Sequence, residues 1–210
     1  PKKNIKEFCG KPIIAYSIKS ALESGLFDEV MVSTDSEEIA AIARQYGASV
    51  PFMRSGETAN DYASTIDVCR EVLRCYEEIG RTFDYFCCLY PTAPFVTPDK
   101  LKEAFARLSD PETKPLSVFP VTAFSYPPQR GLYVNEKNQT SWVYPEHQFT
   151  RSQDLPKIYH DCGQFYFINM ELFRQNGYDD VDETTQAIIM GENEVQDIDT
   201  PEDWTLAELK

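Results

Sequence analysis

The chain has 210 residues, and its 20 basic and 34 acidic side chains give a formal net charge of −14. A surface of that sign is repelled by DNA and by anionic lipid, so the composition excludes a generic nucleic-acid binder or a charge-driven membrane binder. No run approaches the ~20 apolar residues of a membrane helix, and the six cysteines show no CxxC spacing. We expect a cytoplasmic protein with reduced thiols and with no nucleic-acid or membrane partner.

Helix and strand patterns alternate along the first half of the chain. Apolar residues at spacings of three and four predict helices over residues 12–24, 36–47, 64–79 and 97–108. Short apolar or β-branched runs predict strands over residues 29–33, 49–53, 85–89 and 116–121. This rhythm is typical of a mostly parallel sheet covered by helices on both faces.

The alternation breaks over residues 122–161, which contain Pro127-Pro128, a turn at residues 135–138 and closely spaced aromatic residues. We interpret this segment as an antiparallel arm that lines a site or meets a partner subunit. The remaining patterns predict strands over residues 164–168 and 187–190, and helices that follow Asn169 and Thr200. We therefore expect one domain over residues 1–210.

Charge is unevenly distributed along the chain. Residues 179–210 contain eleven acids and one base, whereas residues 1–11 contain four lysines and one acid. Because an open α/β sheet binds ligands at the carboxyl ends of its strands, the two ends could meet there across a polyphosphate and its metal. A solvated acidic tail opposite a basic end explains the composition equally well.

Asp197-Ile198-Asp199 precedes the predicted helix start at Thr200. Residues two apart in an extended segment point the same way, so these two carboxylates can share one hard cation such as Mg²⁺. The alternative is that acids ahead of a helix simply favour its dipole. That alternative explains Glu202 and Asp203 better than the two aspartates, so the pattern favours a metal site.

Other polar residues are weaker candidates. Arg54, Asp61 and Thr65 lie in a loop between a strand and a helix, where they could hold a ribose or a phosphate, as strand-end loops often do. Alone, Lys2-Lys3-Asn4 is more typical of solvated surface. His160, within the arm, is more often a hydrogen-bonded structural residue than a base. The sequence contains no nucleophile motif and no glycine-rich phosphate fingerprint.

Taken together, several segments resemble the sugar-acid cytidylyltransferases, which make CMP-activated sialic-type sugars. The matching stretches are Pro1 to Ile5, Gly10 to Ile13, Val32 to Ile39, Arg54 to Asp61, Tyr90 to Pro94 and Asp197 to Thr200. Within the family, Tyr126 to Arg130 and Tyr159 to Tyr166 most resemble the pseudaminic acid branch. The resemblance implies a Rossmann-like three-layer α/β fold of the nucleotide-diphospho-sugar transferase type, and a homodimer joined through the arm at residues 122–161.

The resemblance also implies residue roles. Lys3 and Asn4 would contact the triphosphate of CTP, with Lys3 catalytic. Arg54, Asp61 and Thr65 would bind the rest of the nucleotide. Asp197 and Asp199 would be catalytic and hold Mg²⁺. The residues expected near the sugar acid are Tyr90, Arg130, Arg151, Gln164, Phe165 and Tyr166.

One departure from the family concerns the N-terminus. The family begins with a strand and a loop of the form Ala-Arg-Gly-Gly-Ser-Lys-Arg, and this sequence starts after both. The resemblance therefore implies that a central strand and the phosphate cradle are missing, and that the 210-residue chain is inactive by itself. Two other functions fit the same residues: a glycosyltransferase that uses a nucleotide sugar, and a non-catalytic nucleotide-sugar-binding domain.

Overall fold

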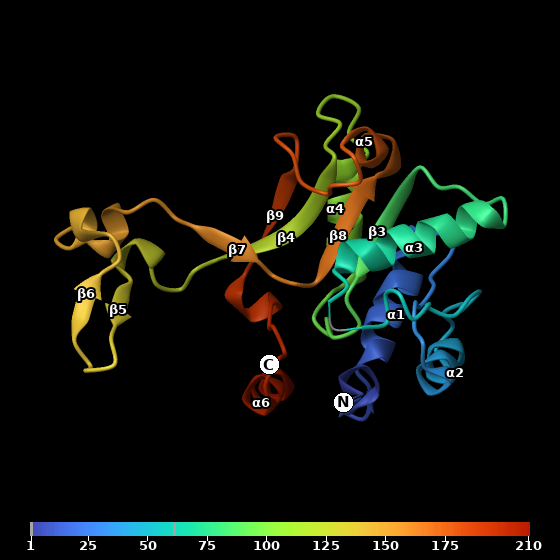
Figure 1. Ribbon diagram of the computed structural model, residues 1–210, viewed down its shortest axis with the longest axis horizontal. Helices are drawn as coiled ribbons and strands as arrows, with labels where there is room; N and C mark the ends of the chain where they lie inside the picture. Colours follow the sequence, from blue (N-terminus) through green and yellow to red (C-terminus); the bar gives the residue numbers. More distant parts are fainter. Residues whose placement is uncertain (1, 61) are drawn as a thin grey trace.

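The computed structural model describes residues 2–60 and 62–210. Its central sheet lies between helices on both faces (Figure 1). The strands of this sheet are β3 (Tyr85–Leu89), β4 (Ser117–Ala123), β7 (Tyr159–Asp161), β8 (Phe165–Asn169) and β9 (Gln186–Met190). Strand β8 pairs with β3 and with β4, and β9 pairs with the other edge of β4.

The strand directions differ from the mostly parallel sheet predicted from the sequence. Strands β3, β4 and β9 share one direction, but β8 runs antiparallel to both of its neighbours. The reason is the arm, which turns the chain back without a crossover helix, so β7 and β8 must return antiparallel to β4. Gly163, with a φ of 60°, lies in the bulge between these two returning strands. The α/β class is confirmed, with a mixed sheet.

All helices except α1 begin at the caps that the sequence indicated. Their bounds are α1 (Ile14–Ser24), α2 (Glu37–Gln45), α3 (Thr65–Glu78), α4 (Pro98–Leu108), α5 (Met170–Gln175) and α6 (Pro201–Leu209). The side chains of Ser36, Ser64, Thr97, Asn169 and Thr200 each accept a hydrogen bond from a backbone N–H of the first turn. Two short strands, β1 (Glu7–Phe8) and β2 (Lys11–Pro12), form a small hairpin before α1.

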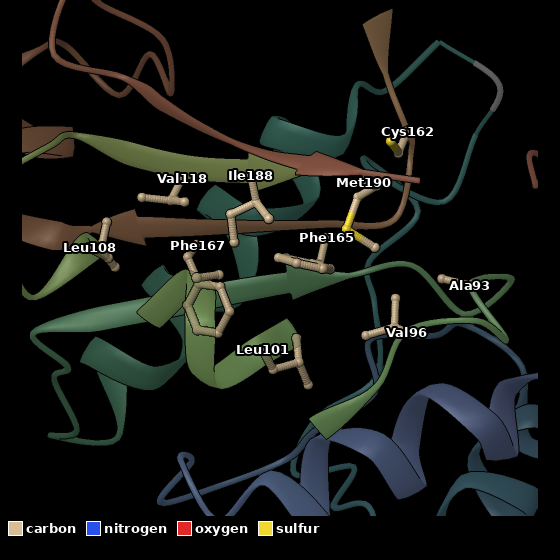
Figure 2. Close-up of a cluster of buried hydrophobic side chains, with 11 residues drawn as sticks. Ala93, Val96, Leu101, Leu108, Val118, Cys162, Phe165, Phe167, Ile188 and Met190 are labelled. Atoms are coloured by element: carbon tan, nitrogen blue, oxygen red, sulfur yellow. The ribbon is translucent and has the colours of Figure 1, made fainter. Parts of the chain in front are cut away.

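The main core lies between α4 and one face of the sheet. Phe165 and Phe167 of β8 are fully buried there against Leu101 and Leu108 of α4 (Figure 2). The ring of Phe27 stacks on Phe167 with centroids 5.8 Å apart. The opposite face of the sheet packs against α3 and α5 in a second cluster, formed by Ile66, Leu73, Phe86, Leu116, Ile168, Met170, Leu172 and Phe173. The protein is therefore a three-layer α/β domain.

Two predicted strands, over residues 29–33 and 49–53, are reduced to a single parallel bridge between Met31 and Ser49. The Val32 N–H donates to Ser49 O over 2.9 Å, and the Ser49 N–H donates to Val30 O over 2.8 Å. Among the described residues, no strand pairs with the opposite edge of residues 29–33. A two-stranded ladder is marginal by itself, which explains the short pairing.

Residues 122–161 form an arm that extends away from the main body (Figure 1). Its hairpin pairs β5 (Leu132–Val134) with β6 (Thr140–Trp142), and Asn138 in the turn has a φ of 57°. The arm exposes large apolar side chains, including Tyr126, Tyr133, Val134 and Phe149. The antiparallel arm predicted from the sequence is confirmed. Within the described part of the chain, no helix is long and apolar enough to cross a membrane.

Candidate functional site

The two ends of the chain meet beside the sheet. The Lys3 ammonium donates to the Ile198 carbonyl over 2.6 Å and lies 3.3 Å from a carboxylate oxygen of Asp199. In Figure 1 the N-terminus and α6 lie at the same end of the molecule. The basic and acidic extremes of the sequence therefore lie side by side at Lys3 and Asp199, which is the first of the two arrangements that the composition allowed.

Ile198 explains why the flanking aspartates face solvent. Its side chain is 1% exposed and packs with Phe8, Ile13 and Trp204. Alternation in an extended segment then directs Asp197 and Asp199 outward, and both are exposed. The hydrophobic contact thus leaves both carboxylates exposed, with that of Asp199 beside Lys3.

The cap of α6 is formed by a different acid. Asp203 accepts hydrogen bonds from the Thr200 N–H over 2.8 Å and from the Asp199 N–H over 3.2 Å. These bonds, with that from the Thr200 hydroxyl, lower the pKa of Asp203. Because Asp203 supplies the capping carboxylate, the side chains of Asp197 and Asp199 are not needed for it. The helix-cap explanation accounts for Asp203 and leaves the two aspartates to another role.

Three of the residues expected to bind nucleotide, Asn4, Arg54 and Thr65, line the polar end of a large cleft, whereas Lys3 does not line it. The cleft has a volume of about 750 Å³, and Asn4, Arg54, Thr65 and Tyr90 line it. The Arg54 guanidinium donates to the Ser33 carbonyl over 2.7 Å and to its hydroxyl over 3.1 Å. This anchors Arg54 at the carboxyl end of residues 29–33. Asp61, also expected at this site, lies outside the described residues.

A second, smaller pocket of about 300 Å³ adjoins the cleft at Thr65 and Tyr90. The hydroxyls of Thr65 and Tyr90 are 3.0 Å apart, and the ring centroid of Tyr166 lies 5.6 Å from that of Tyr90. The Tyr166 hydroxyl donates to Asp161 over 2.5 Å. Burial and the neighbouring Asp161 raise the pKa of Tyr166, so its hydroxyl stays protonated and remains a donor. The structure thus brings Tyr90 and Tyr166 together.

Two acidic residues of this pocket were missed as site residues in the sequence. Asp161 and Asp180 both line it, and burial raises the pKa of Asp180. The described lining contains no lysine or arginine. Asp161 belongs to the segment that resembles the pseudaminic acid branch, but it has no motif of its own. Asp180 is brought to the pocket only by the turn that follows α5.

Gln164 and Phe165 do not share this pocket with Tyr166. Phe165 is completely buried in the core on the α4 side of the sheet. Gln164 is 1% exposed, and its amide donates to the Glu194 carbonyl over 3.1 Å. Neighbouring residues of a strand point to opposite faces, so Phe165 and Tyr166 cannot both face one ligand. Phe165 therefore does not line this pocket, and its expected contact with the sugar remains a prediction.

Arg130 and Arg151 lie in the arm, outside both cavities of their own chain. The Arg130 guanidinium lies 5.7 Å from the Trp142 ring centroid and donates to Thr150 O over 3.3 Å. Arg151 forms a bidentate ion pair with Asp154, at 2.7 and 3.1 Å. Neither residue lines the pocket of Tyr90 and Tyr166.

The chain is similar to known cytidylyltransferases over most of its length. A family model described as cytidylyltransferase matches residues 1–187. A pseudaminic acid cytidylyltransferase of Campylobacter jejuni is 41% identical over 100% of this chain and 89% of its own length. A CMP-N,N'-diacetyllegionaminic acid synthase of Legionella pneumophila is 33% identical over 99% of this chain and 88% of its own length.

A solved structure shows the same fold at low identity. It is a CMP:2-keto-3-deoxy-manno-octonic acid synthetase complexed with CTP, with a TM-score of 0.69 and 16% identity over 100% of this chain and 91% of that one. The fold and both sequence matches agree. The chain belongs to the cytidylyltransferase family.

Proposed function

We propose that the protein joins CTP to pseudaminic acid, giving CMP-pseudaminic acid and pyrophosphate. The observation that carries this proposal is the 41% identity, over the whole chain, to a protein named for that activity. The geometry is compatible with it. A polar cleft end containing Asn4 and Arg54 adjoins a separate pocket walled by Tyr90 and Tyr166.

The two cavities suit the two substrates. Arg54, Asn4 and Thr65 offer donors to the nucleotide at the polar end of the cleft. In the smaller pocket, the carboxylates of Asp161 and Asp180 can accept hydrogen bonds from sugar hydroxyl and acetamido N–H groups, while the Tyr90 and Tyr166 rings cover apolar faces. Thr65 and Tyr90 border both cavities, so the two substrates would meet there.

The reaction needs no protein nucleophile. The anomeric oxygen of the sugar acid attacks the α-phosphorus of CTP, its proton is released, and the bond to pyrophosphate breaks in line. Positioning and charge neutralisation then lower the barrier. Lys3 would offset negative charge on the phosphates. Its ammonium group lies 3.3 Å from a carboxylate oxygen of Asp199, the residue expected to hold the magnesium ion that the phosphates bind.

The residues beside Lys3 fit a magnesium ion. Two exposed carboxylates two residues apart supply the hard oxygen donors that Mg²⁺ prefers, with substrate phosphates completing its coordination. Groups of three or more His, Cys, Asp or Glu residues that could hold a metal do not occur in the described part of the chain, so a site made of protein ligands alone is not seen there. We therefore assign Mg²⁺ to a site that Asp197 and Asp199 form together with the phosphates of CTP. When bound, the ion would neutralise phosphate charge.

We also infer that a further β-strand completes the sheet in the large cleft. The cleft is lined by residues 26–35 and 82–91, and by apolar side chains of α1 and α3. Its walls include the edge of β3 that does not face β8. A strand placed there would pair with β3 and with residues 29–33, and its carboxyl end would reach Asn4 and Arg54.

The exposed apolar arm supports a homodimer. Tyr133 is 65% exposed and Val134 is 64% exposed on a hairpin that extends away from the body. A patch of this kind favours burial against a second copy. In such a dimer, the arm of one subunit could carry its Arg130 and Arg151 to the other subunit's sugar pocket, which has no basic residue in its described lining.

Substrate choice tests the function directly. With CTP and Mg²⁺, the full-length enzyme should release pyrophosphate with pseudaminic acid and form CMP-pseudaminic acid in excess over CMP-N-acetylneuraminic acid when both sugars compete at equal concentration. Mass spectrometry of the products gives the ratio. A larger yield of CMP-N-acetylneuraminic acid would contradict the substrate assignment, and transfer of sugar to an acceptor would indicate a glycosyltransferase.

The metal assignment predicts different effects for two neighbouring acids. Asp199→Asn replaces an anionic ligand with a neutral one of the same shape, so turnover should fall at least ~100-fold and need more Mg²⁺. Glu202→Gln, in the first turn of α6, should change the rate little because only a dipole interaction is lost. Initial rates over a range of Mg²⁺ concentrations, with thermal melts to check folding, measure both. Unchanged turnover and Mg²⁺ dependence in Asp199→Asn would falsify the assignment.

The added-strand proposal predicts a gain of activity. The chain extended by the residues encoded upstream of Pro1 should release pyrophosphate from CTP, whereas the 210-residue chain should not. Amides of residues 85–89 should also exchange more slowly in the extended protein, because β3 gains hydrogen-bond partners. A Gly/Ser extension of equal length is the control. Equal turnover and equal exchange in the 210-residue and extended chains would exclude the proposal.

If the arm forms the dimer interface, a charge introduced into the arm should disrupt the dimer, whereas a charge introduced elsewhere on the surface should not. Val134→Asp places a carboxylate in the proposed interface and should convert the dimer to a monomer in sedimentation velocity runs. Ile189→Asp is the matched control, because Ile189 is 62% exposed on β9, away from the arm. Dimers in both variants would show that the arm is not the interface.

A further inference from the structure

Glu71 is a charged residue in a buried position. It lies on α3 with 9% of its surface exposed, and it is the one charged residue in the buried class among the described residues. Its carboxylate accepts a hydrogen bond from the Ser55 N–H over 2.7 Å and another from the Thr58 hydroxyl. Both donors belong to the loop over residues 54–60. The helix therefore holds this loop through a buried anion.

The carboxyl group of Glu71 is stabilised in its ionised form by these contacts. Burial alone would raise the pKa of its carboxyl group, but the hydrogen bonds from Thr58 and Ser55 outweigh burial and lower the pKa. No lysine or arginine of the described chain forms a salt bridge with it; the nearby Arg74 pairs with Glu78 instead. The loop donors thus satisfy an otherwise costly buried charge.

The same loop begins with Arg54. Its backbone N–H donates to the Thr34 carbonyl over 2.9 Å, and its side chain donates to Ser33. One end of the loop is thereby tied to residues 33–34, and Glu71 ties the following residues to α3. Thr58 and Asn60 of this loop also line the cleft, whereas Glu71 does not. Glu71 can act on a bound nucleotide only through the loop.

We propose that Glu71 is a positioning residue that holds the loop over residues 54–60 in the conformation that binds CTP. This inference rests on the proposed function. The carboxylate fixes two loop donors at once, so Arg54, Thr58 and Asn60 keep their places when the site is empty. Without it, nucleotide binding must also order the loop, which weakens binding but leaves the reacting groups unchanged once CTP is bound.

The test separates positioning from general stability. In the full-length enzyme, Glu71→Gln should raise KM for CTP about tenfold, as loss of a charged hydrogen bond implies, with kcat within about twofold of the wild-type value. Amides of residues 55–60 should exchange faster, whereas those of β3 should not change. Glu78→Gln is the control, because Glu78 is an exposed residue of the same helix. It should change neither KM nor exchange.

A second variant tests the contact from the loop side. Thr58→Val removes the hydroxyl donor. Because the two side chains share one contact, the rise in KM for CTP in the double variant Glu71→Gln/Thr58→Val should be smaller than the two single effects combined and close to the larger of them. If Glu71→Gln fails to fold, a raised KM and faster loop exchange in Thr58→Val would still support the proposal. Wild-type KM and exchange in a folded Glu71→Gln enzyme would overturn it. Absence of CTP binding by the wild-type enzyme would instead overturn the proposed function, and this inference with it.

Discussion

Side-chain alternation along β8 is the constraint on which the rest of the structure depends. Phe165 and Phe167 fill the core against α4, so Tyr166 and Ile168 must face the layer of α3. A one-residue shift would turn a tyrosine hydroxyl into the core against α4 and two phenylalanines toward the layer of α3. The same register that stabilises the domain therefore places Tyr166 beside Tyr90, at the wall of the smaller pocket.

Hydrophobic contacts also hold the polar end of the site. Ile198 is buried among Phe8, Ile13 and Trp204, and this contact fixes the C-terminal segment against the N-terminal one. The ammonium of Lys6 lies 4.1 Å from the Trp204 ring centroid and adds a cation–π interaction to the same junction. Asp199 and Lys3 meet as a consequence. Exposed carboxylates are thus positioned by a buried apolar neighbour.

The sheet, the cleft and the arm are linked by topology. Because the chain leaves β4 through the arm and returns as β7 and β8, one side of β3 is paired with β8 and its other side borders the cleft. Residues 29–33 border the same cleft and form only one bridge. The proposed extra strand, the polar end of the cleft and the smaller pocket therefore share walls.

The sequence by itself determined the helices, four strands of the central sheet, the arm and the family. These features depend on local spacing, caps and motifs: Ser64 begins a helix, and aspartates two residues apart in an extended segment point the same way. The tertiary structure alone decided the direction of β8, the exclusion of Phe165 from the pocket, and the positions of Asp161, Asp180 and Glu71. Those features depend on which strand lies beside which and on what covers each face. Contacts between residues far apart in the chain leave no periodic pattern in the sequence.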